Sequence, residues 1–278
     1  MTANQNDLGA AEIEESVVAG QGITVRYGGV TALRNVSISV PPASVVGLIG
    51  PNGAGKSTLV GVLSGLISPQ QGRVYLAGEE VTSLPTHRRA LRGLSRTFQH
   101  PELFSGMCVR EHLTVAWRAH YDRARGWRDF VDGGAWRRPS RQEDERVDAL
   151  MAALGIEDLG SASVAGMPLG RSRLVEIARA LACSPKVVLL DEPLSGLNAA
   201  ESAHLAETIN RLKETEKVSF LLIDHDVDTV LAHSAKVVVL NFGEVIATGT
   251  ARQVWENPAV RAAYLGGETI AAGNENAH

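Results

Sequence analysis

The 278-residue chain has no long apolar run, few cysteines, few aromatic residues and no excess of positive charge. No stretch approaches the ~18 consecutive apolar residues that a membrane-spanning helix requires, so we expect any membrane role to depend on a partner protein. The opening residues carry several acids but no apolar core, which excludes a signal peptide or a transit peptide. We therefore expect residues 1–16 to form a disordered tail.

Cysteine content and charge narrow the class of protein further. The two cysteines, Cys108 and Cys183, stand among small or apolar residues, which favours buried free thiols in a reducing compartment over a disulfide. The formal net charge of −4 leaves no basic domain that would coat a nucleic acid, so we expect no nucleic-acid partner.

Apolar residues make up 44% of the chain, and their spacing predicts alternating strands and helices. In the C-terminal third, the runs VVLL, VSFLLI and VVVL are separated by helical segments, which is typical of a parallel sheet with crossover helices. Residues 121–142 have no periodicity and predict a long loop or an insertion. Two stripes with i, i+3, i+4, i+7 spacing predict helices: Val147, Leu150, Met151 and Leu154, and Leu174, Ile177, Ala178 and Leu181.

The segment GPNGAGKST (50–58) predicts a phosphate-binding loop. It matches G-x-x-x-x-G-K-[ST], and it lies directly between an apolar strand and a helical segment. Glycines allow a tight backbone whose N–H groups point at phosphate oxygens, and the helix N-terminus adds partial positive charge. We expect Lys56 to reach the β- and γ-phosphates, Ser57 to ligate Mg²⁺ and Thr58 to bind near the α-phosphate. The nucleotide-binding residues predicted here are Asn52, Gly53, Ala54, Gly55, Lys56, Ser57 and Thr58.

Two adjacent acids, Asp191 and Glu192, end the apolar run KVVLLDE. Carboxylates at the end of a buried strand are costly unless a positive group lies nearby. Ligands of parallel sheets bind at the carboxyl ends of the strands, where the phosphate loop also lies. We therefore expect Asp191 to hold Mg²⁺ through a water molecule and Glu192 to activate the water that attacks the γ-phosphate.

Further segments stand in a consistent order around these motifs. They are VRYGGV with Tyr27, TFQ with Gln99, SGLN at 195–198 and LLIDHD with His225. The whole set resembles the ATP-binding-cassette (ABC) ATPases over residues 17–267. The resemblance implies an α/β P-loop NTPase fold of the ABC type, with a parallel sheet core, an N-terminal antiparallel β part and an inserted helical subdomain. That subdomain would span about 100–165 and continue into the helix after 170, and residues 268–278 would form a C-terminal tail.

The resemblance also implies roles for single residues. Tyr27 would stack on adenine, Gln99 would contact Mg²⁺ and report to a transmembrane partner, and His225 would hydrogen-bond the γ-phosphate. The loop at 195–198 would line a dimer interface. The implied catalytic residues are Glu192, His225 and Lys56, and the implied metal site is made of Ser57, Gln99 and Asp191.

The sequences of several segments resemble the ATPase subunits of branched-chain amino acid importers, in particular the subunit with the longer insert in its helical region. The segments that carry this likeness are SRTFQHPELFSGMCVREHLTVA, EPLSGLN, IDHDVDTVLAHSAKVVVLNFGEVIATGT and NPAVRAAYLGG. The likeness implies a second ATPase subunit, permease subunits and, indirectly, a periplasmic or lipoprotein solute-binding protein. The chain would then lie at the cytoplasmic face of the membrane. Importers of urea, amides and aromatic acids share this ATPase type and remain alternatives.

One motif departs from the ABC pattern. The second fingerprint is normally Leu-Ser-Gly-Gly-Gln, and its serine and N–H groups bind the γ-phosphate held by the other subunit. Here the aligned residues are MPLGR (167–171): Gly170 is kept and assigned to nucleotide binding, while Pro168 replaces the serine and Arg171 the glutamine. Pro168 offers neither a hydroxyl nor an N–H. We therefore expect an asymmetric pair of nucleotide sites, formed with a partner whose fingerprint is intact.

Other functions remain open at this stage. The ATPase of an exporter or lipid extractor would use the same chemistry. A repair or translation protein of the ABC class normally carries two cassettes or a long coiled coil, which this sequence lacks. A small-molecule P-loop kinase would transfer the phosphoryl group to an acceptor, and a subunit that binds ATP without turnover would agree with Pro168.

Overall fold

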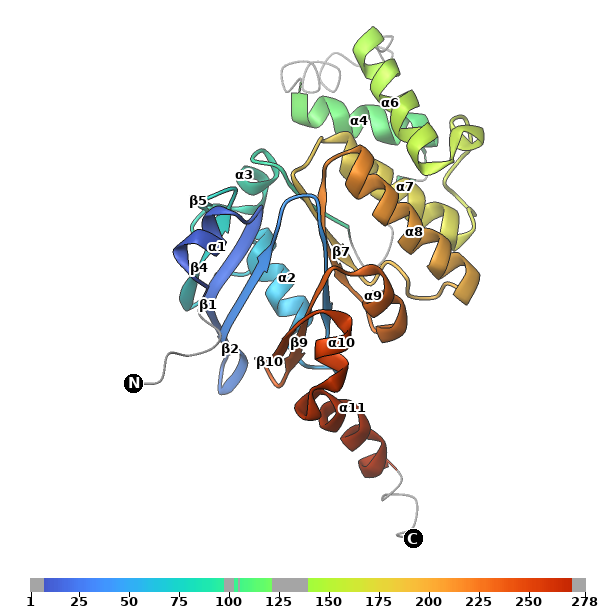
Figure 1. The fold of residues 1–278 in the computed structure, drawn as a ribbon. Coiled ribbons are helices and arrows are strands. Elements are labelled where there is room, and N and C mark those ends of the chain that lie inside the picture. The colour runs from blue at the N-terminus through green and yellow to red at the C-terminus, as the bar shows by residue number, and fades with distance from the viewer. Residues whose placement is uncertain (1–7, 98–102, 105, 122–139, 272–278) are drawn as a thin grey trace.

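The computed structural model describes residues 8–97, 103–104, 106–121 and 140–271. Their strands form two sheets that face each other across helix α2 (Lys56–Ser64), and further helices cover the outer face of the larger sheet (Figure 1). This is the α/β fold with a parallel core and an N-terminal antiparallel part that the sequence predicts.

Within the described residues, the larger sheet has six strands in the order β10-β9-β3-β8-β7-β6, and the smaller has four in the order β2-β1-β4-β5. In the larger sheet, β9, β3, β8, β7 and β6 run parallel, and β10 is antiparallel to β9. The strands are β1 (Val18–Tyr27), β2 (Val30–Val40), β3 (Val45–Ile49), β4 (Gln71–Leu76), β5 (Glu79–Glu80), β6 (Leu94–Arg96), β7 (Val187–Asp191), β8 (Ser219–Ile223), β9 (Lys236–Asn241) and β10 (Glu244–Gly249).

The central strands of the larger sheet are apolar because both of their faces are covered. Every residue of β3, β7 and β8 is buried, as the continuous apolar runs predict. One apolar cluster fills the space between the two sheets around α2, and a second lies between the larger sheet and the outer helices. The strands that lead into the phosphate loop and into the acid pair are therefore buried along their whole length.

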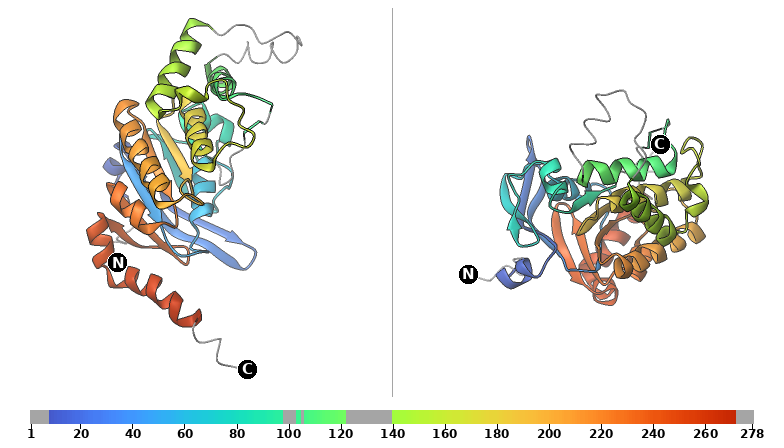
Figure 2. Two further views of the ribbon diagram at one scale, coloured as in Figure 1. Left: turned by 90° about the vertical axis from the view of Figure 1, so that its right-hand side faces the viewer. Right: turned by 90° about the horizontal axis from the view of Figure 1, so that it is seen from above.

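The outer helices include the predicted helical subdomain. In this region α4 (Val109–Tyr121), α6 (Arg141–Leu154) and α7 (Leu169–Ala182) pack on one another, and both predicted apolar stripes are buried. The other helices of the described segments are α1 (Ala10–Glu14), α3 (Thr86–Ala90), the 3₁₀ turn η1 (Glu157–Leu159), α8 (Ala199–Thr215), α9 (Val227–His233), α10 (Ala251–Glu256) and α11 (Pro258–Ala271). Helix α11 projects from the end of the molecule opposite α4 and α6 (Figures 1 and 2). No helix in the described ranges is long and apolar enough to cross a membrane.

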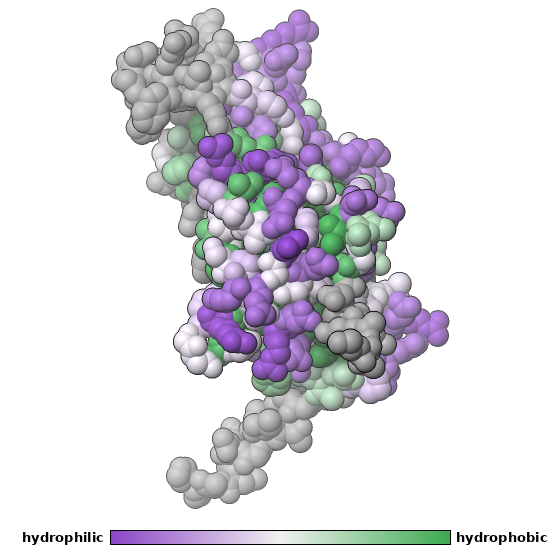
Figure 3. All heavy atoms as spheres, turned by 90° about the vertical axis from the view of Figure 1, so that its left-hand side faces the viewer, coloured by the Kyte–Doolittle hydropathy of each residue, from purple (hydrophilic) through white to green (hydrophobic). Residues whose placement is uncertain are grey.

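The face that carries α1 and the antiparallel sheet is mostly hydrophilic, with small apolar patches (Figure 3). In β4, buried and more exposed residues alternate, because one face of this sheet packs on α2 while the other meets water.

The expectation of a disordered tail at 1–16 is wrong for residues 10–14. Residues 10–14 form α1, in which Ile13 is buried. Glu12 accepts a hydrogen bond from Ser39 Oγ at 2.6 Å and pairs with Lys236 Nζ at 3.1 Å. The hydrogen bond with Ser39 and the charge of Lys236 lower the pKa of Glu12, although its partial burial opposes the shift. The sequence pattern predicts disorder here because it does not reveal the partners of Glu12, which lie 27 and 224 residues away in the chain.

Two further expectations concern positions that the structure does not describe. Gln99 and residues 122–139 of the predicted insert lie outside the described residues. At the other end, helix α11 continues to Ala271, beyond the predicted domain boundary at 267.

A buried ion pair holds two helices of the subdomain together. Arg118 of α4 donates from Nε to Glu143 Oε1 of α6 at 2.5 Å, with the two side chains 8% and 2% exposed. Glu143 also closes the capping box of α6 with Ser140, and the interaction with Arg118 lowers the pKa of Glu143 against the opposing effect of burial. The pair therefore fixes both the start of α6 and its position against α4.

We expect Arg118→Met to lower the free energy of unfolding by about 3–5 kcal/mol, because it leaves the Glu143 carboxylate buried without its partner charge. Urea unfolding followed by circular dichroism measures the change. The matched control is Arg141→Met, which removes an exposed i, i+4 pair with Glu145 and should cost at most about 1 kcal/mol. Equal effects of the two substitutions would contradict this reading of the buried pair.

Candidate active site

The phosphate-loop motif occupies the turn between β3 and α2. Gly53 and Gly55 adopt positive φ angles of 79° and 104°, and Gly55 is the residue from which the helix begins. A Cβ atom on Gly55 would stand 2.7 Å from the Ala32 carbonyl oxygen, so glycine is required there by both conformation and space. The loop therefore has the tight backbone that lets successive N–H groups point at a bound anion.

Lys56 lies inside this loop rather than in open solvent. Its side chain is buried, and Nζ donates to the carbonyl oxygens of Gly50 at 2.6 Å and Pro51 at 3.1 Å. Burial lowers the pKa of Lys56, while the carboxylates of Glu192 and Asp191 act in the opposite direction. The structure thus brings the positive group of the loop within electrostatic range of the acids at the end of β7.

The two acids differ in their surroundings. Asp191 is buried at the last position of β7, and its carboxylate Oδ2 accepts a hydrogen bond from Arg96 Nη2 at 2.8 Å. Glu192 follows at φ 50°, in the left-handed region that costs a residue with a side chain roughly 1–2 kcal/mol. Its N–H donates to the Ile223 carbonyl at 2.8 Å, which fixes the strained turn against β8. Such strain at a candidate base agrees with a functional role.

A buried aspartate organises the end of β8. Asp224 accepts hydrogen bonds from the backbone N–H groups of Leu194, His225 and Asp226 at 2.9, 2.8 and 3.1 Å. Burial raises the pKa of Asp224, and these backbone donors oppose the shift. His225 Nδ1 lies 3.3 Å from Asp224 Oδ1, and its ring is 59% exposed. Asp224 therefore connects the candidate γ-phosphate ligand to the loop that follows Glu192.

Tyr27 lies at the end of β1 with half of its surface exposed, paired in register with Val30 of β2. The adjoining part of β2 contacts the phosphate loop. The turn between β9 and β10 joins them, because Gly243 N donates to Ala54 O at 3.0 Å and Arg34 N donates to Gly243 O at 2.8 Å. The strand of Tyr27 is thus tied to the phosphate loop through β2, as an adenine-stacking role requires.

The altered fingerprint forms the start of α7. Pro168 is the N-cap residue and provides no side-chain hydrogen bond. Arg171 forms an ion pair with Asp158, which was not foreseen. Gly170 lies against Glu201 of α8, and a Cβ on Gly196 would meet Leu169 Cδ2 at 2.9 Å. The fingerprint and the loop at 195–198 therefore lie side by side in this chain.

Two residues of the site had no role assigned from the sequence. Asp224 stands in the quoted segment LLIDHD, directly before His225. Arg96 stands in SRTFQ, and it pairs with Leu189 of β7, two residues before Asp191. A charged residue in a short strand next to the strand of the acid pair is the signal that identifies it, since residues two apart share one face of a sheet.

The donor set suits magnesium. Ser57 is exposed at the start of α2, and Asp191 supplies a carboxylate, so both offer the oxygen ligands that Mg²⁺ prefers. Within the described part of the chain, His, Cys, Asp and Glu side chains form no cluster of three or more that could hold a metal alone. Magnesium normally keeps several waters and binds through one or two protein ligands together with substrate phosphates, which agrees with this sparse set.

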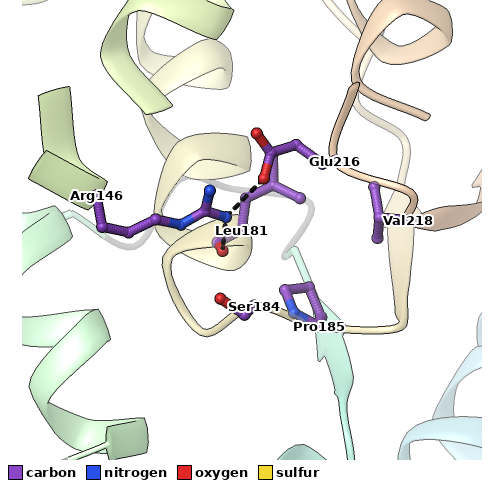
Figure 4. A pocket seen from close by; sticks show the side chains of 6 residues that line it. All are labelled: Arg146, Leu181, Ser184, Pro185, Glu216 and Val218. Carbon is purple, nitrogen blue, oxygen red and sulfur yellow. Dashed lines mark hydrogen bonds and ion pairs between the residues drawn. The ribbon is translucent and has the colours of Figure 1, made fainter. Parts of the chain in front are cut away.

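A separate cavity of about 340 Å³ lies away from the phosphate loop, where α6, the end of α7, the end of α8 and the start of β8 meet (Figure 4). Arg146 points across it and pairs with Glu216 Oε2 at 2.7 Å. None of the predicted site residues lines this cavity, so it is not the candidate nucleotide site.

Comparison with known proteins gives the ABC family, which the sequence motifs resemble, over most of the chain. A family model described as "ABC transporter" matches residues 33–195, and one described as "Branched-chain amino acid ATP-binding cassette transporter" matches residues 244–269. The chain is similar to the high-affinity branched-chain amino acid transport ATP-binding protein BraF of Pseudomonas aeruginosa, at 37% identity over 88% of this chain and 96% of the relative. It is 34% identical to LivG of Escherichia coli, over 91% of this chain and 99% of that protein.

A solved structure agrees with the fold. The crystal structure of an ATP-binding cassette of an ABC transporter in its ADP conformation matches with a TM-score of 0.79 and 29% identity, over 90% of this chain and 99% of that one. A further sequence relative belongs to another kind of transport system. The lipopolysaccharide export system ATP-binding protein LptB of Haemophilus influenzae is 31% identical over 90% of this chain and 98% of that protein.

We expect Asp224→Ala to lower the free energy of unfolding by about 2–3 kcal/mol, because it leaves three backbone donors without their acceptor. Urea unfolding measures the loss. Asp228→Ala, at an exposed position four residues later, is the control and should cost less than about 1 kcal/mol. If Asp224→Ala were no more damaging than the control, Asp224 would not organise this loop.

Proposed function

This chain belongs to the ABC transporter ATP-binding family, and we propose that it is the ATP-hydrolysing subunit of an importer for branched-chain amino acids or related small polar solutes. The observation that carries the proposal is the placement of Lys56 in the phosphate loop within range of Asp191 and Glu192. The match of residues 244–269 to the branched-chain amino acid model supports this cargo over a lipid. Lipid export is the second candidate, because LptB is also a relative.

ATP binding follows from the loop geometry. The N–H groups of residues 53–58 and the start of α2 would bind the phosphates, and Lys56 would exchange its carbonyl partners for the β- and γ-phosphate oxygens. Tyr27 would stack on adenine and Gly170 of one subunit would face the nucleotide held by the other. Ser57, Gln99 and Asp191 would hold Mg²⁺, which neutralises phosphate charge in the transition state.

Hydrolysis requires a base beside the γ-phosphate. The Glu192 carboxylate would accept a proton from the attacking water, whose oxygen forms the new bond to phosphorus while the bond to the ADP oxygen breaks. His225 would donate a hydrogen bond to the γ-phosphate, positioned by Asp224. Because a carboxylate at this place activates water, the products are ADP and inorganic phosphate rather than a phosphorylated acceptor.

The partners follow from exposed surfaces of the same chain. The adjacent surfaces at 169–170 and 195–198 would face a second ATPase subunit, and permease subunits would dock at the helical subdomain. The chain would bind peripherally to the cytoplasmic face of the membrane through those permeases. Pro168 removes one hydroxyl and one N–H from the fingerprint, and losing one such donor costs about 2–4 kcal/mol in a pre-organised site. The nucleotide site that faces this fingerprint would therefore turn over slowly.

We expect Glu192→Gln to lower the rate of phosphate release at least about a hundredfold while ATP binding is retained, because the amide cannot accept the proton. A phosphate-release assay and ATP titration by calorimetry measure the two effects on the complex with its partner subunits. Glu207→Gln, at an exposed position of α8, is the matched control and should leave both unchanged. Unaltered turnover in Glu192→Gln would rule out Glu192 as the base.

The altered fingerprint gives a second prediction. We expect Pro168→Ser to raise phosphate release by the purified chain alone about tenfold or more, because it restores the hydroxyl and the N–H of the fingerprint. Ala165→Ser, an exposed position in the preceding loop, is the control for a serine that does not reach the nucleotide. An unchanged rate in Pro168→Ser would show that Pro168 does not limit turnover.

A further inference from the structure

We propose that Arg96 is a positioning residue that sets the metal affinity of Asp191, so that Mg²⁺ binds together with ATP rather than ahead of it. The proposal deepens the proposed function and rests on it, because it takes Asp191 as a magnesium ligand. It concerns a residue to which neither the motifs nor the family resemblance assigned a role.

The ion pair is close and shielded from water. Arg96 Nη2 and Asp191 Oδ2 are 2.8 Å apart, and the two side chains are 16% and 8% exposed. The other end of the guanidinium is held as well, because Nη1 donates to Ser64 Oγ of α2 at 3.4 Å. Arg96 therefore spans from the last residue of the phosphate-loop helix to the acid that ends β7.

The backbone keeps the two partners in place. Strands β6 and β7 pair in parallel, with Leu94 opposite Val187 and Arg96 opposite Leu189. Past the end of β6, Thr97 N donates to Leu189 O at 3.0 Å, and Asp191 N donates to Thr97 Oγ1 at 3.3 Å. The pairing of β6 with β7 thus fixes the positions of the two backbones from which Arg96 and Asp191 make their contact.

This placement has a direct electrostatic consequence. A guanidinium on one carboxylate oxygen cancels most of the negative charge that a second cation would meet, and it repels that cation at short range. In the absence of nucleotide, Asp191 paired with Arg96 is therefore a weak metal ligand. When ATP brings its phosphates into the loop, they supply the missing negative charge, and Mg²⁺ then binds. The pair makes metal binding conditional on nucleotide.

Lys56 does not supply the same control. Its Nζ donates to the Gly50 and Pro51 carbonyls of its own loop, whereas Asp191 forms its ion pair with Arg96. Lys56 is expected to move to the phosphates, whereas Arg96 is anchored to β6 and α2 and stays beside Asp191.

The test measures metal binding directly, with Mn²⁺ as the probe and electron paramagnetic resonance as the readout. In the absence of nucleotide, we expect Arg96→Met to bind Mn²⁺ about tenfold more tightly than the wild type, because it removes one positive charge next to Asp191. Arg96→Lys should stay within about threefold of the wild type, since it keeps the charge. The double variant Arg96→Met with Asp191→Asn should lose the gain.

Two controls keep the result specific. Arg92 stands shortly before Arg96 in the chain and forms a more exposed ion pair with Glu79. Arg92→Met removes that pair and should not alter Mn²⁺ binding. Arg96→Gln is the second variant if Arg96→Met fails to fold, with the same expected gain in Mn²⁺ affinity. Unchanged or weaker Mn²⁺ binding in the neutral variants would overturn the proposal and would mean that Arg96 only stabilises the fold. Binding of Mn·ATP to the wild type tests the proposed function separately: absence of binding would refute the nucleotide site, whereas the Mn²⁺ affinities measured without nucleotide report on Arg96 alone.

Discussion

Buried negative charge at the carboxyl ends of β7 and β8 is the constraint on which the rest of this structure depends. Asp191 and Asp224 are both buried there, and a buried carboxylate is tolerated only when charges or donors surround it. The protein meets the need in two ways: Arg96 pairs with Asp191, and three backbone N–H groups bind Asp224. Those partners in turn fix β6 against β7 and the loop after Glu192 against β8.

The same constraint bears on the chemistry proposed for this site. Strands β3, β7 and β8 are buried along their whole length and pair in parallel, β3 with β8 and β8 with β7, so their carboxyl ends have a fixed order at one edge of the sheet. Lys56, at the start of α2 after the loop that follows β3, and the acids at the ends of β7 and β8 are therefore held within electrostatic range of one another. A pre-organised set of this kind stabilises phosphoryl transfer by position and charge, with little rearrangement during the reaction. The polar site thus stands at the edge of a sheet whose central strands are apolar and buried.

Sequence patterns predicted the fold and most of the candidate site because their signals are local. The phosphate loop is one continuous motif, and the stripes around Leu150 and Ile177 follow the helical period, so neither depends on distant partners. Arg96, Asp224 and α1 were missed because contacts of each join distant parts of the chain. Arg96 meets Asp191 across 95 residues, and Asp224 meets Leu194 across 30. Glu12 of α1 meets Lys236 across 224 residues. Whether a charged side chain is solvated or buried in a pair is decided by the packing of strands, which a local pattern does not contain.

The central claim is that one magnesium nucleotide binds where the phosphate loop and the paired acids meet. A crystal structure of the chain grown with Mn²⁺ and a non-hydrolysable ATP analogue tests it most directly, because anomalous scattering locates the metal. The account predicts the β- and γ-phosphates in the loop at 53–58 and the metal between Ser57 and Asp191, with Arg96 still beside Asp191. A nucleotide bound elsewhere, or a metal that contacts neither Ser57 nor Asp191, would contradict the account.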